Sequence, residues 1–224
     1  MTDLSPQSNV GDIASTLPGA AEVFRQNGIS FCCGGKLSLA EAAAGQGLDV
    51  APLLDALRAL EDGTARTAPE ETLPLIDHIL TRYHATHRTE LDWLIPLAEK
   101  VEMVHGDHDE APLGLTEALV ALRDELESHM TKEEQVLFPM MRQGGHPMIR
   151  HPIGAMRHEH DTAADLLRGI EHATHGLVLP VGACRSWTAL YTGLEKFTGD
   201  VVAHIHLENT VLFPQFDSSL ARQG

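Results

Sequence analysis

The 224-residue sequence is poor in several features that define large classes of proteins. Its three cysteines are too few for a disulfide framework in a chain of this size, which agrees with a reducing compartment. It has no apolar run of about eighteen residues and no basic, apolar leader, so neither membrane spanning nor export is predicted. Basic residues number 16 against 32 acidic ones, and the formal net charge of −16 makes nucleic acid and anionic membranes poor partners. These absences predict a cytoplasmic protein.

An alternating pattern of polar and apolar residues, which would indicate a half-buried strand, is also missing. Apolar residues instead recur at helical spacing over four long segments, at about 73–105, 112–143, 152–174 and 183–217. Four long helices with modest loops predict an all-α, up-down-up-down four-helix bundle. Pro139 and Pro214 lie late in two of these segments and are expected to kink or end the helices there.

The first 62 residues predict a small domain of short helices. Ser38 is a good N-cap for one of these helices, and Asp49 starts another. The residues that follow, up to Thr72, lack apolar periodicity and are predicted as a linker. The chain is therefore divided into a helical domain at 1–62, a linker at 63–72 and a bundle at 73–224.

The most informative feature is a phrase that occurs twice, 75 positions apart. It reads His129-Met-Thr-Lys-Glu133-Glu-Gln-Val-Leu-Phe-Pro139 and then His204-Ile-His-Leu-Glu208-Asn-Thr-Val-Leu-Phe-Pro214. A His and a Glu four positions apart lie on one face of a helix. The repetition of identities, spacing and helix phase predicts a duplicated metal-ligand module.

The duplication extends upstream to a histidine in each preceding helix. His84 has a counterpart 76 positions later at His160. Two halves packed together then offer four imidazoles and two carboxylates to one bundle interior. Imidazole and carboxylate suit Fe, Mn and Zn, and a carboxylate can bridge two metals. We therefore predict a carboxylate-bridged, non-haem di-iron centre with these metal ligands: His84, His129, Glu133, His160, His204 and Glu208.

The other ten histidines lack this support from the repeat. A single helical histidine is usually a surface residue or a core residue with satisfied hydrogen bonds, and this interpretation is given to all ten. His87 is the closest rival to the chosen set, because it lies on nearly the same helical face as His84. The ten are His78, His87, His105, His108, His146, His151, His158, His172, His175 and His206.

Three further carboxylates are placed to support the predicted ligands. Glu125 and Asp200 each lie one turn before a ligand histidine, and Glu159 is adjacent to His160. A metal-bound histidine usually donates its other ring N–H to a carboxylate or carbonyl. Glu125 and Glu159 are therefore predicted to hold a ligand or to move protons, while for Asp200 an exposed surface position is equally compatible with the pattern.

Cys32 and Cys33 stand next to each other, followed by two glycines and Lys36. Their Cα atoms are about 3.8 Å apart across a trans peptide, closer than the ~4.4–6.8 Å of a relaxed disulfide. The pair is predicted to be free thiols that react with metal or nitrosyl groups, with Lys36 able to lower a thiol pKa. The alternative is that both are small buried apolar residues. Cys184, alone in an apolar helix start, is predicted as a core residue.

The six predicted ligands in a four-helix pattern resemble the hemerythrin-like domain. The segment Asn27-Gly-Ile-Ser-Phe-Cys-Cys-Gly-Gly35 resembles the small domain fused to it in the repair of iron centres (RIC) family, also called the ScdA, YtfE or DnrN proteins. Oxygen-carrying hemerythrins use five histidines with one Glu and one Asp, whereas this chain offers four histidines and two Glu. The resemblance implies a cytoplasmic di-iron stress-response protein, induced by nitric oxide or oxidative stress, that restores damaged iron–sulfur clusters.

The resemblance also implies how the ligands divide, with Glu133 and Glu208 bridging the two irons. His84 and His204 bind one iron, and His129 and His160 bind the other. Three functions stay open: a repair factor that donates iron, a di-iron enzyme that reduces nitric oxide to nitrous oxide, and a sensor that binds O₂ or NO. The fused Cys-Cys domain disfavours the sensor, because no output domain is evident. Expected partners are damaged iron–sulfur proteins and NO or O₂, with the chain a monomer or homodimer.

Overall fold

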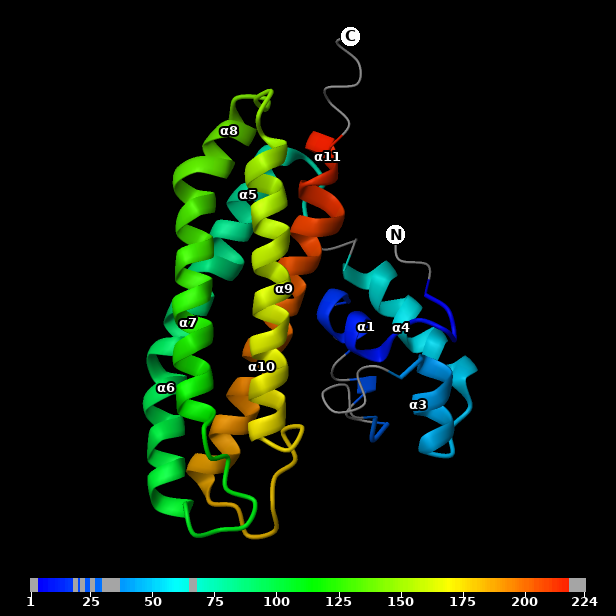
Figure 1. Ribbon diagram of the computed structural model, residues 1–224, viewed down its shortest axis with the longest axis vertical. Coiled ribbons are helices and arrows are strands. Elements are labelled where there is room, and N and C mark those ends of the chain that lie inside the picture. The colour runs from blue at the N-terminus through cyan, green and yellow to red at the C-terminus, as the bar shows by residue number, and fades with distance from the viewer. Residues whose placement is uncertain are drawn as a thin grey trace.

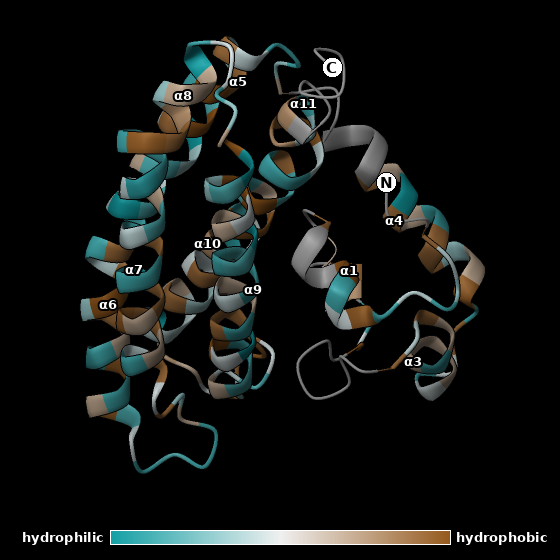
Figure 2. Ribbon diagram, turned by 45° about the horizontal axis from the view of Figure 1, so that its top comes forward, coloured by the Kyte–Doolittle hydropathy of each residue, from teal (hydrophilic) through white to brown (hydrophobic). Residues whose placement is uncertain are grey.

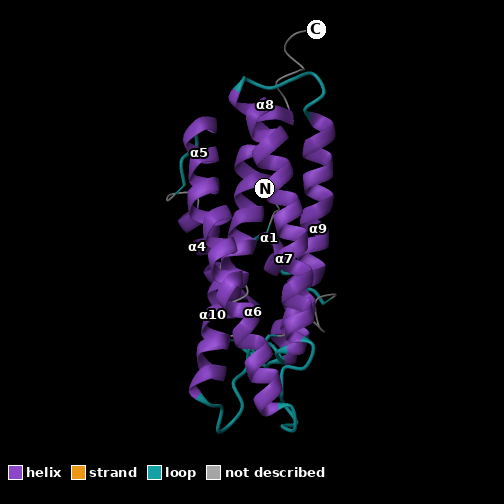
Figure 3. Cartoon of the chain, turned by 90° about the vertical axis from the view of Figure 1, so that its left-hand side faces the viewer, coloured by secondary structure: helices purple, strands orange, loops and turns teal. Residues whose placement is uncertain are grey.

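In the computed structural model the described residues are 4–17, 20, 23–24, 27–29, 37–64 and 68–217, and their regular structure is helical throughout (Figures 1 and 3). Within these ranges the sole β feature is an isolated bridge between Asn9 and Ser38. The predicted all-α fold class is confirmed. No helix in the described ranges is long and apolar enough to cross a membrane.

Four long helical columns, each close to a predicted segment, form the bundle along the vertical axis of Figure 1. Each column packs on its neighbours in chain order, and the fourth closes the ring against the first. The columns are α5 (Thr72–His78), η1 (Ile79–His84) and α6 (Ala85–His105); α7 (Leu115–Lys132), η2 (Glu133–Leu137) and α8 (Phe138–Arg142); α9 (Arg150–Ala173); and α10 (Arg185–Leu207), η3 (Glu208–Leu212) and α11 (Pro214–Asp217).

The two prolines of the repeated phrase neither end nor break their columns. The turn before each widens into a π-helical segment, η2 or η3, in which the N–H of Phe138 or Phe213 bonds five residues back. A helical proline lacks an N–H and its ring crowds the carbonyl four residues earlier, and the wider turn accommodates both defects. Each π-segment begins at the carboxylate of the repeat, Glu133 or Glu208.

Apolar side chains fill the bundle in two clusters, one on either side of the repeated His and Glu residues. The larger cluster includes Leu94, Leu122 and Phe197, and the smaller includes Phe138 and Phe213. Figure 2 shows hydrophobic and hydrophilic residues interleaved along the helices, as amphipathic packing requires. The polar residues between the clusters are therefore sealed from both ends of the bundle.

The N-terminal helices form a separate apolar cluster with Val10, Phe24, Leu39 and Leu57 among its buried members. Ser38 caps α3 in a capping box with Glu41. α1 packs against α10 of the bundle. The bounds of the three described helices are α1 (Val10–Thr16), α3 (Leu39–Gly45) and α4 (Val50–Thr64).

Candidate metal centre

The six residues predicted as metal ligands meet between the two apolar clusters of the bundle. Every one of their side chains is at most 4% exposed. Their donor atoms form two groups, and within each group all atoms lie within 4.8 Å of one another. The His84 group holds His84, Glu133, His204 and Glu208, and the His129 group holds His129, His160 and Glu208. The structure thus brings all six together, and their role as ligands remains a prediction.

Each carboxylate faces one histidine from each group. Oε2 of Glu133 lies 3.4 Å from Nε2 of His84 and 3.4 Å from Nε2 of His129. Glu208 mirrors this arrangement, with Oε1 3.1 Å from Nε2 of His204 and Oε2 3.0 Å from Nε2 of His160. Such an arrangement suits a carboxylate that bridges two ions.

Three of the histidines are oriented by a hydrogen bond from the outer ring nitrogen. Nδ1 of His84 donates to Glu134 at 2.8 Å, and Nδ1 of His129 donates to Glu159 at 3.1 Å. The third is His160, whose Nδ1 donates to the side-chain oxygen of Asn209 at 3.1 Å. When a metal is bound, a neutral ring with its proton on Nδ1 would present the lone pair of Nε2 to the centre, as a metal ligand must.

Several inward-facing atoms have no hydrogen-bond partner among the described residues. They are Nε2 of His84 and both carboxylate oxygens of Glu133, all buried. An unpaired buried polar atom costs about 1–3 kcal/mol, so a fold that gathers three needs a compensating group. A metal cation coordinated by imidazole nitrogens and carboxylate oxygens would give all three atoms a binding partner. The residues present therefore fit a pair of iron ions, the predicted cofactor.

Burial and mutual charge set the protonation of the metal-free site. Burial raises the pKa of Glu133 well above its usual range, and the neighbouring Glu208 carboxylate adds to the effect. Burial acts on Glu208 in the same direction, but charge from His204 and hydrogen bonds from His129 and His160 bring its pKa well below the usual value. Burial, followed by the charge of His204, lowers the pKa of His84 to about 4. The opposite shifts favour a proton on Glu133 and a charge on Glu208 in the metal-free pair, and metal binding must displace any proton from a ligand.

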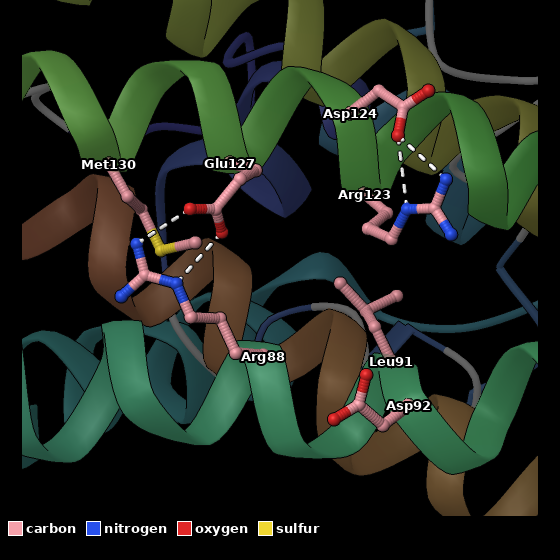
Figure 4. Close-up of a pocket in the computed structure, with 7 residues that line it drawn as sticks. All are labelled: Arg88, Leu91, Asp92, Arg123, Asp124, Glu127 and Met130. Atoms are coloured by element: carbon pink, nitrogen blue, oxygen red, sulfur yellow. Dashed lines mark hydrogen bonds and ion pairs between the residues drawn. The ribbon is translucent and has the colours of Figure 1, made fainter.

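A charged network connects His84 with the surface between α6 and α7. Arg88 donates to Glu134 at 2.9 Å and, through two nitrogens, to Glu127. Figure 4 shows Arg88 and Glu127 paired beside Met130, at a surface cavity of about 170 Å³. The Glu134 carboxylate therefore shares its charge between a buried histidine and a partly exposed arginine.

The supporting carboxylates predicted from the sequence differ in their contacts. Glu159 bonds His129 and also accepts from Lys132. The Glu125 side chain is half-buried and makes no hydrogen bond or ion pair with the residues that the structure describes. Asp200 accepts two hydrogen bonds from Arg82 and one from Lys196. Roles for Glu125 and Glu159 beside the ligands remain predictions.

Two residues at the site were missed in the sequence, Glu134 and Asn209. Each directly follows the carboxylate of the repeated phrase, so the two also lie 75 positions apart. Each accepts from Nδ1 of the histidine that the preceding helix of its half contributes. The sequence does contain a signal for these two partners, because both positions are polar and both lie in register with the repeat.

The structure also bears on the remaining histidines and cysteines. His87, predicted to be exposed or satisfied, is 0% exposed, and neither ring nitrogen has a described partner. Cys184 is half-buried against the larger apolar cluster, and its Sγ lies 3.1 Å from Nε2 of His105. Cys32 and Cys33 lie outside the described residues.

Comparison with known protein families agrees with this geometry. Residues 75–216 match the family model described as the hemerythrin HHE cation binding domain. Residues 6–61 match a second model, ScdA_N, described as a domain of unknown function.

Individual relatives match nearly the whole chain. A "Probable iron-sulfur cluster repair protein" of Haemophilus influenzae is 41% identical over 214 residues, which cover 93% of this chain and 96% of the relative. The "Iron-sulfur cluster repair protein YtfE" of Escherichia coli O157:H7 is 45% identical over 210 residues, covering 92% and 94%. A protein of the same name from Shigella boydii serotype 4 is 44% identical over the same length.

Proposed function

The chain belongs to the repair of iron centres family of hemerythrin HHE proteins, and on that premise we propose that it returns iron to iron–sulfur clusters damaged by nitrosative or oxidative stress. The two iron ions are its cargo. The observation that carries the proposal is the pair of ligand groups joined by Glu133 and Glu208. Six side-chain donors shared between two ions leave coordination positions open through which an acceptor protein can take iron.

The polar residues around the ligands support release as well as binding. Glu134 and Glu159 hold the outer nitrogens of His84 and His129, and their side chains are 31% and 16% exposed. Both pair with a surface cation, Arg88 or Lys132. Protonation of either carboxylate weakens its hydrogen bond to the histidine, and the histidine then binds metal less strongly. The centre is therefore buried while two of its histidines remain coupled to solvent.

A proton is also required at the bridging position when metal leaves. The raised pKa of Glu133, caused first by burial and then by the Glu208 charge, makes it the acceptor of that proton in the metal-free state. Its neutral form lets the two carboxyl groups lie together in a buried site. Glu133 thus takes up the proton that replaces the metal charge, so the empty site does not hold two charged carboxylates side by side.

The same ligand arrangement supports a second candidate, reduction of nitric oxide to nitrous oxide. Two ligand groups that share Glu208 place two metal positions side by side, and when bound the irons would supply adjacent redox-active positions for two NO molecules. An oxygen or NO sensor is the third candidate, and the fused N-terminal segment that matches ScdA_N argues against it.

One experiment separates these candidates. The anaerobically isolated protein is loaded with ⁵⁷Fe, its iron content and Mössbauer spectrum are measured, and it is mixed with an apo-cluster acceptor. Iron donation requires ⁵⁷Fe in the acceptor in proportion to rebuilt clusters. Nitrous oxide production from NO, with the iron retained by the donor, would favour the enzyme instead. A protein purified without bound iron after growth in iron-replete medium would contradict all three.

The remaining parts of the proposal concern setting and partners. We place the activity in the cytoplasm, with damaged iron–sulfur proteins as clients, NO or O₂ as small ligands, and a monomer or homodimer as the working unit. The chain is proposed to divide into a small domain at 1–62, a linker at 63–72 and the iron-binding bundle at 73–224. Cys32 and Cys33 are proposed to contact the client or the iron in transit.

A further inference from the structure

His87 is a buried polar side chain that the proposed ligand set leaves unexplained. Its exposure is 0%, and neither Nδ1 nor Nε2 has a hydrogen-bond partner among the described residues. An unsatisfied buried polar atom costs about 1–3 kcal/mol, and an apolar residue would avoid that cost. The fold thus keeps a destabilising group at this position, next to the site.

The surroundings of His87 place it on the His84 side of the centre. It follows His84 by about one turn of α6, and its ring centroid lies 5.4 Å from that of His204. The His87 ring packs edge-to-face with the buried ring of Phe197, with 5.7 Å between centroids and 88° between planes. The centroid of the Tyr83 ring lies 6.0 Å from that of His87. The imidazole therefore sits in a largely aromatic pocket beside two proposed ligands.

An imidazole carries at least one N–H donor in either protonation state, so the buried His87 ring can donate a hydrogen bond. A dry pocket also strengthens any hydrogen bond that the donor makes, because water does not compete.

We propose that His87 donates a hydrogen bond to a small ligand, diatomic or triatomic, bound at the open metal position beside His84 and His204. This inference rests on the proposed function, since it requires metal at the six residues. Hydrogen-bond donors beside an open metal position govern which small ligands stay bound. His87 is accordingly a positioning residue for NO, O₂ or a similar ligand, and its missing partner is that ligand.

Azide titration of the iron-loaded, oxidised full-length protein tests this proposal, followed by visible absorption and by the infrared band of bound azide. H87L should retain two irons per chain and bind azide about tenfold more weakly, the equivalent of one lost hydrogen bond. H87Q, which keeps an N–H donor, should recover part of the affinity. H151L, at an exposed histidine of α9, should behave like the wild type. In D₂O the azide band should shift in the wild type and not in H87L.

Each other outcome contradicts the proposal in a recognisable way. Wild-type azide affinity in an H87L protein that retains its iron would show that the donor does not reach the ligand. Loss of iron from H87L would make His87 a ligand or a structural support for one. An iron-loaded wild type that binds no azide would show that the metal has no open position for a small ligand beside His87, which contradicts the proposal. Absence of iron from the wild type would instead contradict the proposed function as well.

Discussion

Glu134 and Asn209 stand at the same position of the duplicated sequence and make the same contact in the two halves of the bundle. Each accepts a hydrogen bond from Nδ1 of a buried histidine, His84 or His160. The two contacts differ in charge, because Glu134 is a carboxylate and Asn209 is a neutral amide. A carboxylate partner makes an imidazole a stronger electron donor than an amide does. The duplicated site is therefore electronically asymmetric.

This difference predicts that each position controls the release of the iron nearest to it, with Glu159 as the carboxylate partner of His129 in the other group. In E134Q the oxygen acceptor remains but the charge is lost, so the iron held by His84 should pass to a chelator about tenfold faster, and the other iron should keep its rate. N209D should slow release of the iron held by His160. Stopped-flow transfer to a coloured ferrous chelator measures both phases. Two phases that do not change in E134Q would contradict the asymmetry.

The meeting of the six proposed ligands could be predicted from sequence because it follows from local geometry. The helix period places His129 and Glu133 on one face of a helix. The same spacing at His204 and Glu208 makes a coincidental match improbable. The contacts of Glu134 and Asn209 depend instead on the π-helical turns that begin just before them and rotate the following residues. The prolines predict a kink or a stop, whereas each helix continues through a wider, π-helical turn that comes before the proline.

The state of His87 could not be predicted for a different reason. Its spacing from His84 indicated a related helical face, but burial depends on which residues of another helix lie opposite. Phe197 of α10 covers the ring, and no pattern within α6 contains that information. Contacts across helices, rather than spacing within one, separate a surface histidine from a buried one.

Replacing a proposed bridging carboxylate by leucine should lower the iron content, and at Glu133 it should not lower the stability of the metal-free protein. E133L and E208L should each lose iron, because each removes a carboxylate that faces one histidine from each ligand group. Metal-free E133L should melt at or above the wild-type temperature, since Leu replaces a buried carboxyl whose oxygens have no partner. Iron analysis and thermal denaturation with chelator measure the two effects. If either variant kept two irons with unchanged spectra, the ligand assignment would be wrong.

The low pKa of His84 predicts how acid destabilises the metal-free protein. The folded pKa of about 4 lies below the ordinary value of 6.5, so the folded state binds fewer protons between these pH values. Stability should be fully present above pH 6.5 and fall as the pH drops through 4, by about 3 kcal/mol for this group. Denaturant unfolding of wild type and H84L from pH 7 to 4 measures the difference. An equal acid dependence in both proteins would contradict the prediction, and H151L provides the exposed-histidine control.

Glu159 and Glu125 provide a matched pair of carboxylates near His129. We expect E159L to keep two irons but to change iron release or proton-coupled turnover by ~10–100-fold, because it removes the partner of Nδ1 of His129. E125L should have a smaller effect in the same direction, since its side chain makes no hydrogen bond or ion pair with a described residue. Release kinetics at several pH values compare them. Wild-type kinetics in E125L would identify Glu125 as a surface carboxylate.

Removal of residues 1–62 should separate iron binding from repair. All six proposed ligands lie beyond residue 62, and the buried apolar cluster of the N-terminal helices contains no bundle residue. The shortened chain should therefore fold and hold two irons, with a melting temperature lowered modestly by loss of the packing between α1 and α10. Cluster repair should nevertheless fall, because Cys32 and Cys33 are removed, and the full-length C32S/C33S double variant should lose repair to the same extent while keeping its iron. Loss of iron on truncation would make the N-terminal helices part of the site's support. Full repair by the shortened chain would show that the two cysteines are dispensable and that their role is packing.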